Sequence, residues 1–154
     1  MGKLAADTRL RVDLLCHDSR VDSRRIGIAG HSLGGKMAFY TGCLDPRIRV
    51  ILASDFGLGW DQTNWDDIWY WGKEQVRVFK QAGIDHAGLL QASGCKPFAL
   101  LAGKYDNEKS LDILQSAGYA DKPDSLCFIN HAEGHRPPQW ALDRGYDFLR
   151  SQLE

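Results

Sequence analysis

The stretch Gly30-His31-Ser32-Leu33-Gly34-Gly35 decides the fold of this sequence. It follows a short apolar run, Arg25–Gly30, and precedes a segment of helical character, Gly34–Leu44. A G-x-S-x-G motif between a strand and a helix places its serine on a sharp turn, with the hydroxyl at the carboxyl edge of a sheet. The sequence therefore predicts that Ser32 is a nucleophile.

The glycines of the motif and the residue after the serine have expected roles of their own. We interpret Gly30 and Gly34 as positions where a side chain would collide at the tight crossing of strand and helix. The backbone N–H of Leu33, at the start of the helix, is expected to stabilise a developing oxyanion.

A serine nucleophile needs a base, and two of the five histidines are placed to supply one. His131 and His135 follow an apolar run, Leu126–Ile129, which we predict to be a strand whose carboxyl end lies at the same edge as Ser32. We favour His135, which lies in the loop before the next helix. His131 directly follows the strand, and we interpret it as a structural histidine.

The acid of such a site falls between the serine and the histidine in chain order. Asp106 lies in the loop after the predicted strand Pro97–Ala102, and Asp55 directly follows the predicted strand Arg49–Ser54. Either carboxylate could orient the imidazole, and either could instead cap a turn or a helix. We favour Asp106 because the loop after the later strand is the usual place for this acid.

The remaining pattern alternates helices with short apolar strands, as in an α/β fold with a parallel sheet. We expect a single domain over residues 1–154, with a minimal sheet of about four strands flanked by helices. An aromatic-rich lid or insertion is expected over about 56–94. Helices are predicted at Leu4–Cys16, Lys73–Ala82, Asp85–Ala92, Ser110–Ala117 and Pro138–Leu153, in addition to Gly34–Leu44.

Five aromatic residues gather in the insertion: Trp60, Trp65, Trp69, Tyr70 and Trp71. Such a group is costly to leave in water. It could form a lid or a substrate-binding wall over Ser32, or it could be a small core under a long loop or a subunit contact. The sequence does not separate these alternatives.

Composition excludes several classes of protein. The chain has 154 residues and a net charge of −1, which argues against a nucleic-acid partner. No apolar run approaches the ~20 residues of a membrane-spanning helix, and the first residues do not form a secretory signal. Cys16, Cys43, Cys95 and Cys127 lie far apart, so we expect reduced thiols, no metal site and a cytoplasmic location.

The stretches GHSLGGKMAFYTGCLDPRI, PFALLAGKYDNE and INHAEGHRPPQ resemble the α/β-hydrolase superfamily. The resemblance is strongest to dienelactone-hydrolase-like esterases and to acetylxylan and glucuronoyl esterases. It implies a Ser32–Asp106–His135 triad, an acyl-enzyme intermediate and no cofactor. Dienelactone hydrolases proper use a cysteine nucleophile, so Ser32 favours ordinary ester hydrolysis.

The resemblance also bears on the substrate. Lys36 is similar to a lysine of the glucuronoyl esterase elbow that helps to bind a sugar acid, although a solvent-facing helix residue is the simpler interpretation. In that family the acid can also follow the strand before the insertion, which would favour Asp55. We expect a small-molecule ester, contacted by His31, Lys36, Trp60 and Trp65.

A full hydrolase of this superfamily has about eight strands, and this sequence supplies four. The elbow strand should therefore be an edge strand, and the loop that normally gives the second oxyanion donor is missing. We expect two or more copies to associate and cover this edge, unless the chain is a fragment. The predicted function is hydrolysis of short acyl esters, including sugar esters, by a serine mechanism. The alternative is a non-catalytic remnant that binds a ligand or partner.

Overall fold

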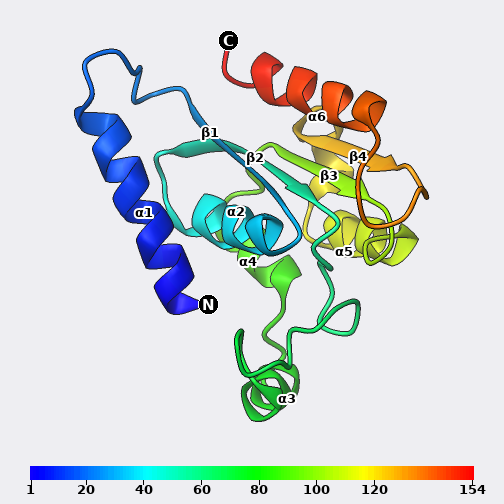
Figure 1. Ribbon diagram of the computed structural model, residues 1–154. Helices are drawn as coiled ribbons and strands as arrows, with labels where there is room; N and C mark the ends of the chain where they lie inside the picture. The colour runs from blue at the N-terminus through cyan, green and yellow to red at the C-terminus, as the bar shows by residue number, and fades with distance from the viewer.

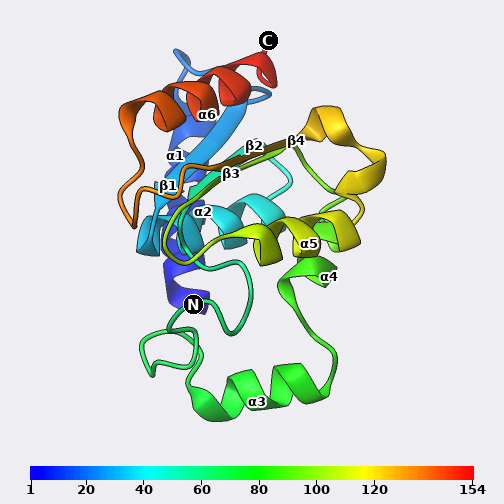
Figure 2. The same cartoon turned by 90° about the vertical axis from the view of Figure 1, so that its right-hand side faces the viewer.

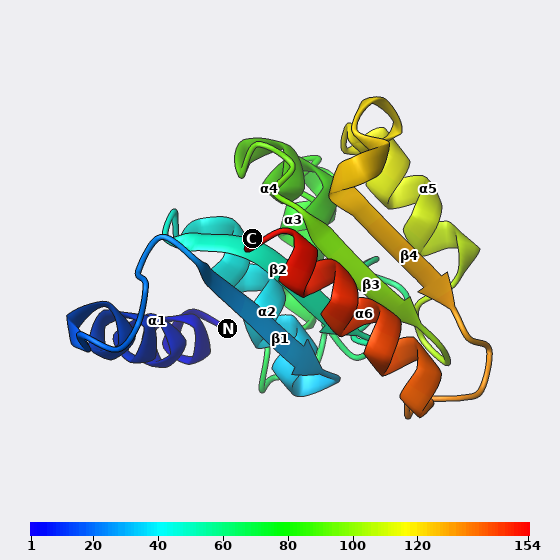
Figure 3. The ribbon, with the colours of Figure 1, turned by 90° about the horizontal axis from the view of Figure 1, so that it is seen from above.

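Four parallel strands form one sheet in the spatial order β1-β2-β3-β4. The structure is a computed structural model that describes all 154 residues. Seen from above, the four arrowheads point toward the same end of the sheet, so the loops that follow the strands share one edge (Figure 3). The predicted apolar runs are confirmed as the strands β1 (Ile26–His31), β2 (Ile48–Ser54), β3 (Phe98–Ala102) and β4 (Leu126–Asn130).

Helices cover both faces of the sheet (Figures 1 and 2). On one face lie α2 (Leu33–Leu44), α4 (His86–Ala92) and α5 (Glu108–Ser116), and on the other lies α6 (Gln139–Ser151). The helix α1 (Gly2–His17) packs beside α2, and α3 (Lys73–Gln81) lies away from the sheet. The predicted α/β architecture is confirmed. Two short 3₁₀ helices that the sequence did not predict, η1 (Tyr119–Asp121) and η2 (Pro123–Ser125), precede β4.

The core explains why these runs became strands. All five residues of β3 are fully buried, as expected for a strand with helices on both faces. The larger apolar cluster has 20 buried residues and includes Phe56, Leu58 and Trp65 of the insertion. The insertion therefore contributes to the main core, although Trp69 is 82% exposed.

The first helix buries little of its apolar surface. Only Ala5 and Val12 of α1 are buried, while Leu10, Leu14 and Leu15 are exposed. These leucines lie on a helix that contacts α2 and none of the strands closely, so only one side of it can pack. The helix predicted at Leu4–Cys16 is confirmed as α1.

The strand β1 lies at one edge of the sheet and pairs only with β2. This confirms the expectation that the strand before Ser32 has an unpaired side. Cys43 and Cys95 are buried, Cys16 and Cys127 are partly buried, and all four are free thiols. None of the helices combines the length and the apolar character needed to cross a membrane.

Candidate active site

Ser32 occupies a strained turn between β1 and α2. Its φ is +55° and its ψ is −117°, in a region that residues other than glycine rarely adopt. The backbone N–H of Ser32 donates to the carbonyl of Ser54 at 2.9 Å, which ties the turn to the end of β2. This is the sharp turn that the motif predicted. Strain of this kind persists only where the surrounding structure enforces it, as the hydrogen bond to Ser54 does here.

The glycines that permit this turn are Gly30 and Gly35. A Cβ on Gly30 would lie 2.0 Å from the carbonyl oxygen of Gly34, and one on Gly35 would lie 2.8 Å from the Cβ of Phe56. A Cβ on Gly34 would meet nothing within 4 Å. The expected collision at Gly34 is therefore wrong, since that residue faces open space and its neighbour makes the close contact.

His135 connects Ser32 to a carboxylate, and that carboxylate is Asp55. The Nε2 atom of His135 lies 3.0 Å from Ser32 Oγ, and its Nδ1 atom lies 2.6 Å from Asp55 Oδ2. Asp55 is fully buried, and the side chain of His135 is 36% exposed. The three side chains come from the ends of β1, β2 and β4, so the shared carboxyl edge of the sheet assembles them.

The environment of Asp55 keeps it ionised. Burial opposes the charge, but the hydrogen bond from His135 and those from the backbone N–H groups of Asp106 and Tyr105 outweigh it. The pKa of the Asp55 carboxyl is therefore lowered from its ordinary value. An ionised carboxylate at Nδ1 holds the imidazole in the tautomer whose Nε2 can accept a proton from serine.

Asp106, favoured from the sequence as the acid, has a different set of partners. One carboxylate oxygen accepts from the N–H groups of Phe56 at 2.8 Å and Gly57 at 3.0 Å. The other accepts from the N–H of Leu58 at 2.7 Å and the hydroxyl of Ser110 at 2.9 Å. Burial raises the pKa of this carboxyl even so. The structure thus corrects the assignment, because the partner of His135 is Asp55 and not Asp106.

The loop contacts explain the correction. Asp106 follows β3, which lies next to β4, so strand order alone does not favour Asp55 as the partner of His135. Both carboxylate oxygens of Asp106 accept hydrogen bonds from its own surroundings, whereas Asp55 accepts backbone N–H groups at Oδ1 and has Oδ2 directed at His135. Chain order places both residues between Ser32 and His135 and could not reveal these contacts.

Two further histidines lie near the site without contacting Ser32 Oγ. The ring of His31 lies 4.6 Å from that of His135, and its Nδ1 is 3.2 Å from Ser54 Oγ. Burial and the neighbouring His135 lower the pKa of His31. His131 is buried and accepts from the N–H of Glu133 at 3.1 Å, in keeping with the structural role expected for it. No group of three or more His, Cys, Asp or Glu side chains in the structure could hold a metal ion.

A cavity of about 370 Å³ opens beside Ser32. Lys36, one helical turn after Ser32, lines it and is only 3% exposed. Its Nζ donates to Asn64 Oδ1 at 2.9 Å and lies 3.8 Å from the centre of the Tyr70 ring. Burial lowers the pKa of Lys36 to about 8. Lys36 is therefore not the solvent-facing residue of the simpler interpretation.

The two tryptophans expected to contact substrate do not line this cavity. Trp65 is fully buried, with Lys36 Nζ 4.1 Å above its ring, so it supports the lysine from below. Trp60 belongs to a separate cavity and donates from Nε1 to the carbonyl of Ile84 at 3.0 Å. Tyr70, one of the five aromatic residues that could form a wall over Ser32, does line the cavity. Its other walls, which the sequence did not predict, include Phe56, Thr63, Asn64 and Tyr105.

An oxyanion donor is available at the start of α2. The N–H of Leu33 belongs to the first turn, where no carbonyl of the helix can accept it. The helix dipole adds a partial positive charge at this end. This N–H therefore has the location that the sequence predicted for it.

Comparison with known proteins finds solved structures of similar fold. No family model matches the sequence, and no curated protein matches it. A glucuronoyl esterase from Solibacter usitatus is similar in structure, with a TM-score of 0.79 and 18% identity over 97% of this chain and 48% of that one. A glucuronoyl esterase from Sporotrichum thermophile gives 0.70 and 18%, over 97% and 50%.

A 2,6-dihydroxy-pseudo-oxynicotine hydrolase is also similar, with a TM-score of 0.70 and 20% identity over 99% of this chain and 47% of that one. The chain thus spans about half the length of the solved structures that it matches. At these identities the likeness establishes fold alone. The chain shares the parallel α/β fold of these structures over about half of their length.

Proposed function

We propose that this chain is a serine hydrolase of carboxylic esters, with Ser32 as nucleophile, His135 as base and Asp55 as the acid that orients it. The observation that carries this proposal is the continuous hydrogen-bonded series from Ser32 Oγ through both ring nitrogens of His135 to Asp55. The glucuronoyl esterases of similar fold support ester hydrolysis as the reaction.

Each of the three groups has a step in the proposed reaction. Ser32 Oγ attacks the ester carbonyl carbon while His135 Nε2 takes the hydroxyl proton, and the carbonyl oxygen becomes an oxyanion beside the N–H of Leu33. When the C–O bond breaks, His135 returns the proton to the departing alcohol. A water molecule, deprotonated by His135, then attacks the acyl-enzyme and releases the acid, and the proton returns to Ser32. Asp55 stays ionised throughout.

The cavity favours small, polar esters. Its volume and its polar residues, among them Lys36, Asn64 and Thr63, suit short acyl groups and sugar esters better than long alkyl chains. Lys36 carries the only cationic side chain on the cavity wall other than an imidazole. We propose that it contacts the oxygen-rich or anionic part of the ester.

The test combines labelling with a matched variant. The native protein should react with a fluorophosphonate and hydrolyse p-nitrophenyl acetate, and Ser32→Ala should lose the label and at least ~10³-fold of the rate. Ser116→Ala is the control, because Ser116 is exposed and its hydroxyl contacts only the carbonyl of Ile113. Unlabelled native protein, or full activity in Ser32→Ala, would contradict the proposal and favour the non-catalytic alternative.

A further inference from the structure

A second cavity, of about 480 Å³, lies along the same helix as Ser32. Ser32, Lys36, Tyr40 and Leu44 recur every four residues and so share one side of α2. Lys36 lines the cavity at Ser32, while Tyr40 and Leu44 line the second one. Tyr40 is about 12 Å from Ser32 along the helix axis, which is too far for the second cavity to hold the reacting carbonyl.

A layer of aromatic side chains separates the two cavities. Trp65 is fully buried, with Lys36 Nζ on its face and the ring of Tyr40 at 5.9 Å, edge to face. Tyr70 lines the cavity at Ser32, whereas the next residue, Trp71, lines the second one. A ligand can therefore occupy one cavity without any change in the other.

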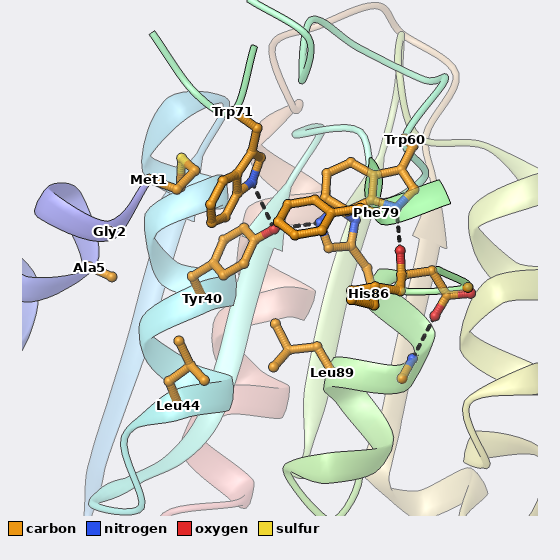
Figure 4. A pocket seen from close by; sticks show the side chains of 14 residues that line it. Met1, Gly2, Ala5, Tyr40, Leu44, Trp60, Trp71, Phe79, His86 and Leu89 are labelled. Atoms are coloured by element: carbon orange, nitrogen blue, oxygen red, sulfur yellow. Dashed lines mark hydrogen bonds between the residues drawn. The ribbon is translucent and has the colours of Figure 1, made fainter. Parts of the chain in front are cut away.

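The walls of the second cavity are aromatic and already packed together (Figure 4). The rings of Trp60 and Phe79 stack at 5.7 Å, and Phe79 meets Trp71 edge to face at 5.1 Å. In this view Leu89 of α4 lies below these rings, and Tyr40 of α2 lies beside Trp71. Preformed aromatic walls of this kind offer flat faces and ring edges, which favour a flat ring as ligand.

The polar atoms of the walls already have partners. The indole N–H of Trp71 donates to the hydroxyl of Tyr40 at 3.2 Å, and that hydroxyl lies 2.7 Å from His86 Nε2. His86 Nδ1 lies 2.5 Å from the carbonyl of Leu58, and the N–H of Trp60 is held by Ile84. With Nδ1–H as the donor to Leu58, the Tyr40 hydroxyl donates to Nε2. Burial lowers the pKa of His86 to about 4, so this ring is neutral at neutral pH.

These contacts limit the chemistry of a ligand. No cationic side chain lines the cavity, and the two charged groups on its wall already have partners. The α-ammonium of Met1 donates to the carbonyl of Tyr70 at 3.2 Å, and the exposed Asp85 carboxylate accepts from the N–H of Gly88. A carboxylate or a sugar held among the aromatic rings would therefore lose its water and gain few hydrogen bonds. Within the series Trp71–Tyr40–His86, the Tyr40 oxygen keeps one free lone pair, which allows a single further donor.

We propose that this cavity is a binding site for an uncharged, flat aromatic molecule of two or three rings, separate from the cavity at Ser32. Its volume is about three times the roughly 150 Å³ of an engineered cavity that holds benzene, which sets the number of rings. The proposal does not depend on ester hydrolysis, because none of the residues that carry it takes part in the proposed reaction.

The test compares two probes of the same size and different charge. 2-Naphthol is neutral at pH 7, and 2-naphthoate is an anion. In ¹H–¹⁵N spectra, 2-naphthol should give saturable shifts of the indole signals of Trp60 and Trp71, and 2-naphthoate should bind at least tenfold more weakly. Trp140 lies on α6, on the other face of the sheet, and its indole N–H donates to Glu133. Its indole signal should not shift.

Variants separate this site from other modes of binding. Phe79→Ala removes one ring and Leu89→Trp fills the space, and each should weaken 2-naphthol binding at least tenfold. Phe148→Ala on α6 is the control, since it truncates an aromatic residue on the other face of the sheet and should leave binding unchanged. Circular dichroism confirms that each variant folds, and Phe79→Ala keeps the test valid if Leu89→Trp does not.

Three outcomes would overturn the proposal. The first is the absence of shifts at Trp60 and Trp71 with 2-naphthol near its solubility limit. The second is competitive inhibition of ester hydrolysis without those shifts, which would locate the ligand at Ser32. The third is a protein whose second copy covers this face, detected by light scattering together with loss of 2-naphthol binding as the dimer forms.

Discussion

Asp55 and Asp106 hold each other's loops in place. Asp55 accepts the backbone N–H of Asp106 at 3.0 Å, and Asp106 accepts the N–H of Phe56, the residue after Asp55, at 2.8 Å. Only one of the pair, Asp55, also contacts His135. Both carboxylates are fully buried. Asp55 orients the imidazole of His135, whereas Asp106 supports the loop that follows Asp55.

Asp55→Asn should lower kcat by roughly 10²–10⁴-fold with little change in KM. The amide cannot stabilise an imidazolium, and it favours the wrong tautomer of His135. Steady-state kinetics with p-nitrophenyl acetate measure the change, and circular dichroism confirms folding. Near-native kcat in a folded variant would contradict the role of Asp55.

Asp106→Asn should instead reduce stability, by roughly 2–4 kcal/mol, because at least one of four buried hydrogen bonds loses its acceptor. Urea unfolding measures the free energy. The folded fraction should keep more activity than Asp55→Asn keeps. The reverse ranking of the two variants would restore Asp106 as the acid.

His86 should make stability depend on pH between about 4 and 6.5. Its pKa is lowered from 6.5 to about 4 in the folded chain, mainly by burial and despite nearby Asp85, so the unfolded chain binds more protons in this window. The free energy of unfolding should fall as pH falls from 6.5 toward 4, by up to about 3 kcal/mol from this group.

Urea unfolding at pH 5 and pH 7 measures this effect as the difference between the native chain and His86→Gln. The subtraction removes the contribution of Asp55, whose lowered pKa gives a loss of stability of the same sign at lower pH. His17→Gln, at an exposed position, should keep the native slope. An unchanged slope in His86→Gln would show that His86 is not the cause.

Lys36 should favour anionic esters below about pH 8 and lose that preference above it. Its pKa is lowered to about 8, so the charge is present at lower pH and absent at higher pH. The ratio of kcat/KM for p-nitrophenyl hemisuccinate to that for p-nitrophenyl butyrate should fall by up to ~10-fold across this pH. Because the Ser32–His135 chemistry is common to both esters, the ratio isolates Lys36. In Lys36→Met this ratio should be low and should not change with pH. A pH-dependent ratio in that variant would exclude Lys36 as the source of the preference.

The unpaired side of β1 should be covered by a second copy in solution. An exposed parallel strand edge invites pairing, and α1 lies beyond the same side of the sheet (Figure 3). Three leucines of α1 are exposed: Leu10, Leu14 and Leu15. Light scattering at micromolar concentration should give at least a dimer. Specific activity that rises with protein concentration would indicate that association completes the site, and a stable monomer would exclude it.

The sequence predicted the strands, the elbow and the choice of His135 because each depends on local pattern. An apolar run bounded by glycine or proline identifies a strand, and the motif places Ser32 at its end. The choice between Asp55 and Asp106 depends on which carboxylate the folded loops direct at His135, and chain order alone cannot determine it. The close contact at Gly35 likewise involves Phe56, a residue 21 positions away that only the folded chain brings near.

The positive φ of Ser32 means that the proposed nucleophile is an unfavourable residue for the backbone conformation at its position. Glycine at this position would adopt the same turn without the cost of roughly 1–3 kcal/mol that such a conformation imposes on a residue with a side chain. Selection for expression or heat resistance alone would therefore drift toward glycine at position 32. Directed evolution on this scaffold should therefore select for turnover in every round, so that the serine is retained.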